Sequence, residues 1–246
     1  MTRPVRLPEV WARFARATSD VYSPDEVAGL PAPVRRYFDA SIAPGTPLVC
    51  AARITMRGAI RIGRWTMFRG TEVLAPHEGF LWAARAGGVI TGSDRYLDGE
   101  GSMAWRALGL VPVMAASGPD VTRSAAGRCA GEAVWVPTTL LPRFGVTWTA
   151  IDEAHITASF GLEDLYELRL TLDDAGRPTS VTFDRWGDPD ETGTYGWHPF
   201  GGDFTEHRTF GGLSVPSRGV LGWHHGTDRW PDGQFFRVEL DSLTTS

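Results

Sequence analysis

Most of the chain alternates hydrophobic and polar residues with a period of two, the spacing of β-strands that bury one face. Ile54, Met56 and Ile60 alternate with arginines and other polar residues, and residues 165–172 and 236–241 repeat the pattern. Short turn-forming segments separate such stretches, which favours antiparallel hairpins. The pattern therefore predicts a mainly β (α+β) fold, a curved antiparallel sheet or half-barrel of roughly nine to eleven strands.

Two helical zones are expected before the first strand. Residues 7–18 place apolar side chains such as Trp11 and Phe14 on one face at helical spacing. The second zone opens at Ser23 with the capping-box sequence Ser-Pro-Asp-Glu and continues, after a proline-rich break, to Phe38. Together they predict a helical N-terminal segment at about residues 7–41.

A third helical zone begins near Pro119 and extends towards Pro137. We expect all three zones to pack on the concave side of the sheet or to close its mouth, because a sheet with one apolar face needs a covering layer. The alternating pattern continues to the C-terminus without a break. The sequence therefore predicts a single β-cradle domain over residues 1–246.

The composition removes several classes of chemistry. All 24 basic residues are arginine, and the chain contains neither lysine nor asparagine. The absence of lysine excludes a P-loop phosphate clamp, a pyridoxal Schiff base and a lysine nucleophile. The net charge of −5 argues against a nucleic-acid partner, which requires a concentrated basic face.

Cys50 and Cys129 lie far apart in the sequence, in different predicted elements, and we expect both to be reduced. No apolar run is long enough for a membrane span, and the N-terminus shows no hydrophobic leader. These features predict a soluble, cytoplasmic protein.

Four segments and one tryptophan resemble an uncharacterised bacterial family known by a domain-of-unknown-function label. They are LPAPVRRYF at residues 30–38, DRYLDGEG at 94–101, EAVWVPTTLLP at 132–142 with the following Trp148, and GLSVP at 212–216. The family resembles the lipoprotein-carrier type of fold, which implies a curved sheet that cups helices around an apolar cavity. Many relatives carry an N-terminal membrane anchor, which we do not expect here.

Glu132 is the first candidate for chemistry, because its neighbours in the third helical zone are apolar. A carboxyl group on a buried helix face is either ion-paired or has a raised pKa and acts as a general acid. Arg123, Arg128 or an arginine of the sheet would supply the ion pair. Glu132 is therefore either a structural residue or a catalytic acid.

Asp94, Tyr96 and Asp98 stand at alternate positions, so a strand that extended this far would present them on one face. The following Gly99 also suits an ordinary turn entry. We take Tyr96 as a candidate catalytic partner of Glu132 and Asp94 as a candidate ligand-binding residue.

Four histidines occur in the C-terminal third: His198, His207, His224 and His225. The spacings that bind a metal from one element are absent, so no metal site and no cofactor are predicted. One imidazole facing a cavity could instead act as an acid–base group opposite Glu132. His207 is the candidate catalytic residue, and His224 is a candidate ligand-binding residue.

Ten tryptophans are many for a chain of this length, and aromatic side chains wall both β-sheet cores and large apolar sites. Trp135, Trp148 and Trp223 are the candidate ligand-binding tryptophans.

Two main hypotheses for function follow, beside a third in which the protein is a protein–protein adaptor that presents an open sheet edge. In the first, the protein is a soluble binding protein for a hydrophobic or amphipathic small molecule held in a β-cradle cavity. In the second, it is a cofactor-independent biosynthetic enzyme, a cyclase or isomerase, that uses acid–base chemistry in the same cavity. Convergent ionisable side chains in the cavity would favour the enzyme, and a purely apolar cavity would favour binding.

Overall fold

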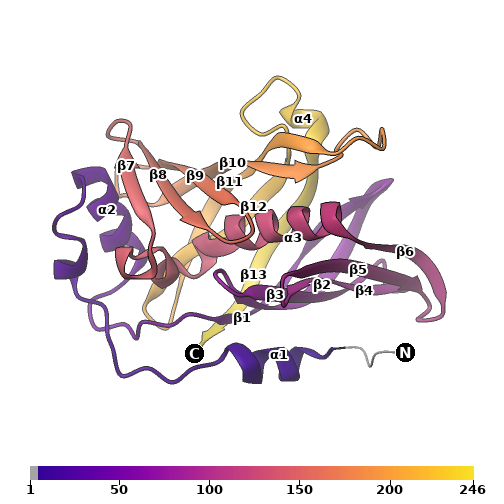
Figure 1. Cartoon of the computed structure of the whole chain (residues 1–246), viewed down its shortest axis with the longest axis horizontal. Coiled ribbons are helices and arrows are strands. Elements are labelled where there is room, and N and C mark those ends of the chain that lie inside the picture. The colour runs from indigo at the N-terminus through magenta and orange to yellow at the C-terminus, as the bar shows by residue number, and fades with distance from the viewer. Residues whose placement is uncertain (1–4) are drawn as a thin grey trace.

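The computed structural model describes residues 5–246, which form one antiparallel sheet of 13 strands (Figure 1). The predicted mainly β fold is thereby confirmed; residues 1–4, which the domain prediction included, lie outside the described part. The strands are β1 (Ala52–Ile62), β2 (Arg64–Ala75), β3 (Gly79–Ala86), β4 (Ile90–Leu97), β5 (Glu100–Ala107), β6 (Val111–Ser117), β7 (Thr147–Ala150), β8 (His155–Gly161), β9 (Leu165–Leu172), β10 (Pro178–Gly187), β11 (Gly196–Phe210), β12 (Leu213–Trp223) and β13 (Gln234–Thr245).

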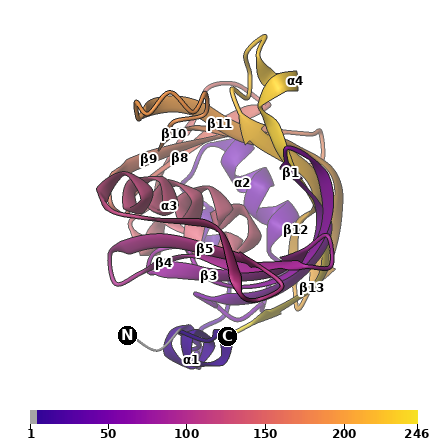
Figure 2. The ribbon, with the colours of Figure 1, turned by 90° about the vertical axis from the view of Figure 1, so that its right-hand side faces the viewer.

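The sheet consists of two meanders joined along one pair of strands. β1 to β6 follow one another by hairpins, as do β7 to β13, and β1 pairs with β13 to join the two halves. The accumulated twist of so many strands curls the sheet, and Figure 2 shows the two halves facing each other across a central space. β6 and β7 are the two edge strands.

The helices occupy three different places. They are α1 (Leu7–Phe14), α2 (Ala32–Ser41), α3 (Pro119–Gly131) and α4 (Trp230–Gly233), with four short 3-10 turns, η1 (Pro24–Val27), η2 (Glu132–Trp135), η3 (Pro137–Leu140) and η4 (Pro142–Phe144). α3 lies inside the curved sheet and packs mainly against β10 and β5, one strand from each half (Figure 2). It approaches closely because its facing residues are small; a Cβ at Gly131 would lie 2.4 Å from the ring of Phe183.

α1 differs from the prediction that every helical zone would lie on the concave side or close its mouth. Figure 2 shows it below the sheet, on the side away from α3. Val10 and Phe14 pack in a small cluster with Val73 and Leu81, which belong to the outer face of β2 and β3. Because the outer face of these two strands carries apolar residues, α1 packs there and shields them from water. α2 closes one end of the sheet, opposite the β5–β6 hairpin (Figure 1).

The structure contains two strands, β5 and β6, that the alternating pattern did not reveal. β5 contains glycine, serine and alanine, which have low β propensity, and β6 contains Pro112. Pro112 is tolerated because β6 is an edge strand, where one row of backbone groups faces away from the sheet. The strands that the pattern did predict are all present, with shifted ends.

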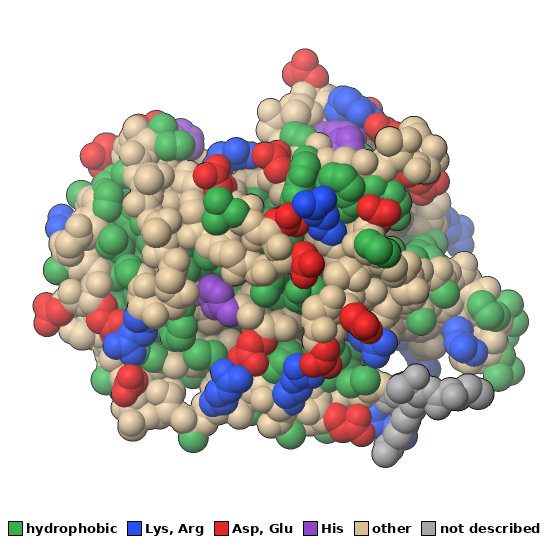
Figure 3. Space-filling model, in the orientation of Figure 1, with side chains coloured by type: hydrophobic (Ala, Val, Ile, Leu, Met, Phe, Trp, Pro, Cys, Tyr) green, Lys and Arg blue, Asp and Glu red, His purple; other side chains and the backbone are tan. Residues whose placement is uncertain are grey.

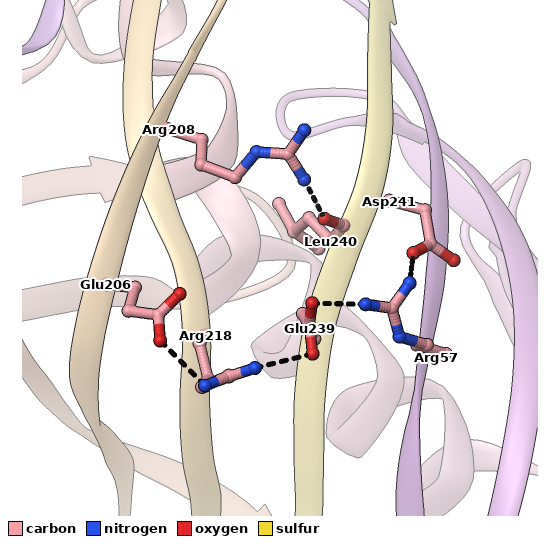
Figure 4. Close-up of polar contacts among 7 residues, drawn as sticks. All are labelled: Arg57, Glu206, Arg208, Arg218, Glu239, Leu240 and Asp241. Atoms are coloured by element: carbon pink, nitrogen blue, oxygen red, sulfur yellow. Dashed lines mark hydrogen bonds and ion pairs between the residues drawn. The ribbon is translucent and has the colours of Figure 1, made fainter.

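Ion pairs stabilise the outer face of the sheet across four strands (Figure 4). Arg218 of β12 binds Glu206 of β11 at 2.6 Å and Glu239 of β13 at 2.8 Å. Arg57 of β1 binds the same Glu239 and also Asp241. These arginines therefore have protein carboxylates as counter-ions.

Acidic and basic side chains are interspersed over the face shown in Figure 3. The β5–β6 hairpin is an exception, because Leu108, Leu110 and Val111 near its tip are exposed. None of the described helices is long and apolar enough to cross a membrane. Cys50 and Cys129 are both free, as expected.

Candidate functional site

The curved sheet and α3 enclose a cavity of about 470 Å³. Residues from β5, β6, α3, β10, β12 and β13 line it, so both halves of the sheet contribute. Its apolar lining includes Ile60, Met103, Met114, Phe204, Leu221, Phe235 and Phe236, and its charged lining includes Asp94, Arg128, Glu132 and Arg185. Met114 and Tyr195 line the cavity and are also exposed, which places the rim between the β5–β6 hairpin and the loop that connects β10 to β11.

Three inward side chains form a row across the floor of the cavity. The strand register pairs Glu72 of β2 with Trp82 of β3, and Trp82 with Asp94 of β4. Since paired residues of neighbouring strands project to the same face, the two carboxyl groups flank the indole of Trp82. Glu72 and Trp82 are fully buried, and Asp94 is largely buried.

Arg128 of α3 connects the row to the helix. Its Nη2 donates to Glu72 at 3.0 Å, its Nη1 to Asp94 at 3.1 Å and its Nε to Glu132 at 2.8 Å. The guanidinium carbon also lies 4.5 Å from the ring centre of Phe80 and 5.1 Å from that of Trp82. Burial acts to lower the pKa of Arg128, but the three carboxyl groups outweigh burial and raise the pKa above its ordinary value.

The surroundings of Glu72 in this cluster favour its protonated form. Burial, followed by the charge of the neighbouring Glu132, raises the pKa of Glu72 well above its ordinary value of 4.5. Glu72 Oε2 and Glu132 Oε2 are both buried and have no hydrogen-bond partner among the described residues. A proton on Glu72, donated to Glu132, would satisfy both oxygens at once.

Asp94, like Glu132, is a carboxyl group of the cluster that also lines the cavity. Burial raises the pKa of Asp94, although the Arg128 charge and a hydrogen bond from Trp105 oppose this shift. Trp105 Nε1 donates to Asp94 Oδ1 at 2.8 Å, while Arg128 binds the other oxygen. The side chain is therefore held rigidly between two donors.

Four of the predicted site residues line the cavity: Glu132, Asp94, Trp135 and Trp223. Glu132 is buried and ion-paired with Arg128, one of the partners anticipated from the sequence. Trp135 Nε1 donates to the carbonyl oxygen of Pro216, which fixes this indole against β12.

The other four lie elsewhere. The Tyr96 hydroxyl donates to Glu163 at 3.1 Å, and His207 contacts the carbonyl oxygen of Pro178 at 2.9 Å, so neither faces Glu132 across the cavity. Trp148 is buried beside α2 and donates to the carbonyl oxygen of Leu140. His224 is buried in the turn after β12, where its nearest acidic group is Asp190 at 3.9 Å.

Arg95, Asp188 and Glu191 also line the cavity and were not predicted. Three charged residues in or beside the cluster were missed as well: Glu72, Arg128 as its centre, and Arg185. The strand pattern did contain a signal for two of them. Glu72 stands at the alternate position before the buried Leu74, and Arg185 at the alternate position after the buried Phe183. Charged residues in the inward register of a strand indicate a buried polar site.

The described residues contain no group of three or more histidine, cysteine, aspartate or glutamate side chains arranged to hold a metal ion. Asp94, Glu72 and Glu132 converge on a guanidinium, which occupies the position of a cation between them.

Comparisons with known proteins place the chain in a family. A search of curated proteins found no match. Among solved structures, the chain is similar to a putative outer membrane lipoprotein-sorting protein domain from Vibrio parahaemolyticus, with 9% identity, a TM-score of 0.43, and coverage of 80% of this chain and 85% of that one. It is also similar to a LolA-superfamily protein from Nitrosomonas europaea, with 9% identity, a TM-score of 0.44, and coverage of 87% and 92%. The model of a family of unknown function, DUF6544, matches residues 20–235, so the chain belongs to that family, as its sequence motifs predicted.

Proposed function

We propose that the protein binds a hydrophobic or amphipathic small molecule in the cavity between the two halves of the sheet. The observation that carries this proposal is the cavity itself. Its volume of about 470 Å³ lies within the range of small-molecule sites, and apolar side chains, many of them aromatic, make up most of its lining. A large apolar space beside a few fixed charged groups suits a ligand with an apolar body and a polar end.

A bulky side chain at Ala116 is expected to block binding. Ala116 lines the cavity from the edge strand β6, whereas its neighbour Ala115 faces the other way and is exposed. N-Phenyl-1-naphthylamine, a neutral apolar dye that fluoresces in dry sites, should bind the native protein at one saturable site. Ala116→Trp should weaken this binding by about tenfold or more because the indole occupies ligand space.

Ala115→Trp is the matched control and should bind the dye as the native protein does. Equal dye binding by both variants would place the dye outside the cavity, and no dye binding by the native protein would contradict the proposal.

A second candidate is a cofactor-independent enzyme, a cyclase or isomerase, that acts in the same cavity. Asp94 and Glu132 favour it, because both line the cavity beside Glu72, whose pKa is raised, and could exchange a proton with a bound molecule. The test is to incubate extract of the host with native protein, Asp94→Asn or Glu132→Gln. A product formed only by native protein supports the enzyme, and a retained but unchanged ligand supports binding alone.

A further inference from the structure

Arg185 of β10 presents a positive charge to the cavity. Its guanidinium carbon lies 4.6 Å from the ring centre of Phe200 and 5.1 Å from that of Trp223. Its Nε donates to the carbonyl oxygen of Ser124 on α3 at 3.0 Å. The aromatic rings and this hydrogen bond hold the guanidinium in place and leave both Nη groups without a protein acceptor among the described residues.

Arg185 also has no ion-pair partner in the described part of the chain. Asp94 and Glu132, the two carboxylates of the cavity that act on its charge, are already bound by Arg128. By contrast, Arg57 and Arg218 on the outer face each bind two carboxylates (Figure 4). Burying an arginine without a counter-ion destabilises the folded protein. The unpaired Arg185 in the cavity therefore indicates that a ligand supplies the counter-ion.

Arg185 remains charged under physiological conditions. Burial, with a further contribution from Arg128, lowers the pKa of Arg185 to about 10, which is still well above neutral pH. Asp94 and Glu132 act on Arg185 only at longer range, since neither bonds to it.

We propose that Arg185 binds the carboxylate of an amphipathic ligand, whose apolar body lies along the aromatic and methionine lining of the cavity. The two Nη groups match the two oxygens of a carboxylate, which a guanidinium binds through paired hydrogen bonds. Phe204, Leu221 and Phe235 lie in the same lining and supply apolar surface for the ligand body. This assignment rests on the proposed binding function and specifies the chemical class of its ligand.

Three ligands of equal chain length separate the possibilities: decanoate, decanol and decylamine, each used to displace N-phenyl-1-naphthylamine from the native protein at neutral pH. Decanoate should bind about tenfold or more tightly than decanol, because hydrogen bonds to charged groups contribute more than neutral ones. Decylamine should bind least well. Dye binding without any preference for decanoate, or a preference for decylamine, would overturn the carboxylate assignment while leaving the binding function intact. Failure of the dye to bind would instead defeat the proposed function.

Arg185→Gln tests the residue itself. In this variant the ratio of decanoate to decanol affinity should fall to near one. Arg169→Gln is the matched control, since Arg169 lies on the adjacent strand β9 and is half-exposed beside Asp184; it should keep the native ratio. A native ratio in Arg185→Gln would show that another group binds the carboxylate. If Arg185→Gln fails to fold, the ligand series on native protein still decides the ligand class.

Discussion

Arg128→Met is expected to destabilise the protein by about 3–5 kcal/mol, the usual cost of breaking a buried ion pair by removing one partner. Arg128 is the common counter-ion of three carboxyl groups, and only 16% of its side chain is exposed. Methionine keeps part of the apolar contact with Phe80 and Trp82 but leaves Asp94 and Glu132 without their donor. Urea unfolding of both proteins at neutral pH measures the difference.

Two further variants make this test specific. Arg123→Met, one turn earlier on α3, removes a more exposed arginine paired with Asp164 and should cost about 1 kcal/mol or less. Arg128→Lys keeps the positive charge but lacks the planar guanidinium that donates to three carboxyl groups. Its stability should therefore lie between those of Arg128→Met and the native protein. A loss for Arg128→Met as small as that for Arg123→Met would mean that the cluster contributes little to folding.

Glu72→Gln is expected to change how stability depends on pH. Because the folded-state pKa of Glu72 is raised, the folded protein keeps a proton that the unfolded chain releases above its ordinary pKa of 4.5. Native stability therefore falls with increasing pH from about 4.5 towards the folded-state pKa, by up to about 1.4 kcal/mol per pH unit for this group. Glutamine is neutral at every pH and can still donate to Glu132, so the variant lacks this loss.

The expected result is a difference that grows with pH. Glu72→Gln should be close to native stability near pH 5 and should gain relative to the native protein between pH 5 and 8. Asp94 titrates in both proteins and so largely cancels in the comparison. Glu167→Gln, on the exposed face of β9, should show no such trend. A difference between Glu72→Gln and native protein that stays constant over this pH range would exclude a proton on Glu72.

The fold could be predicted from the sequence wherever one face of a strand is buried. Tyr166, Leu168 and Leu170 are buried and their neighbours in the sequence are exposed or partly so, which is the pattern that predicted β9. The pattern failed for β6, where most side chains are exposed on both faces. The pattern also could not place α1. An amphipathic sequence shows that a helix buries one face, but it does not show which face of the sheet the helix covers.

The site could be predicted only in part, since it depends on register. The apolar surroundings of Glu132 indicated a buried carboxyl group with an arginine partner, and Arg128 stands four residues earlier on the same chain segment. The sequence could not show that Glu72 and Asp94 flank Trp82, because this follows from the pairing of β2, β3 and β4. Tyr96 alternates with Asp94 along β4, yet its hydroxyl group reaches Glu163 outside the cavity.

The most direct test of a ligand cavity between the two halves of the sheet is a crystal structure of the protein grown with decanoate. The predicted result is a decanoate chain along Met103, Leu221 and Phe235, with its carboxylate bound to Arg185. Decanoate bound only on the outer surface, with ordered water filling the cavity, would contradict the account.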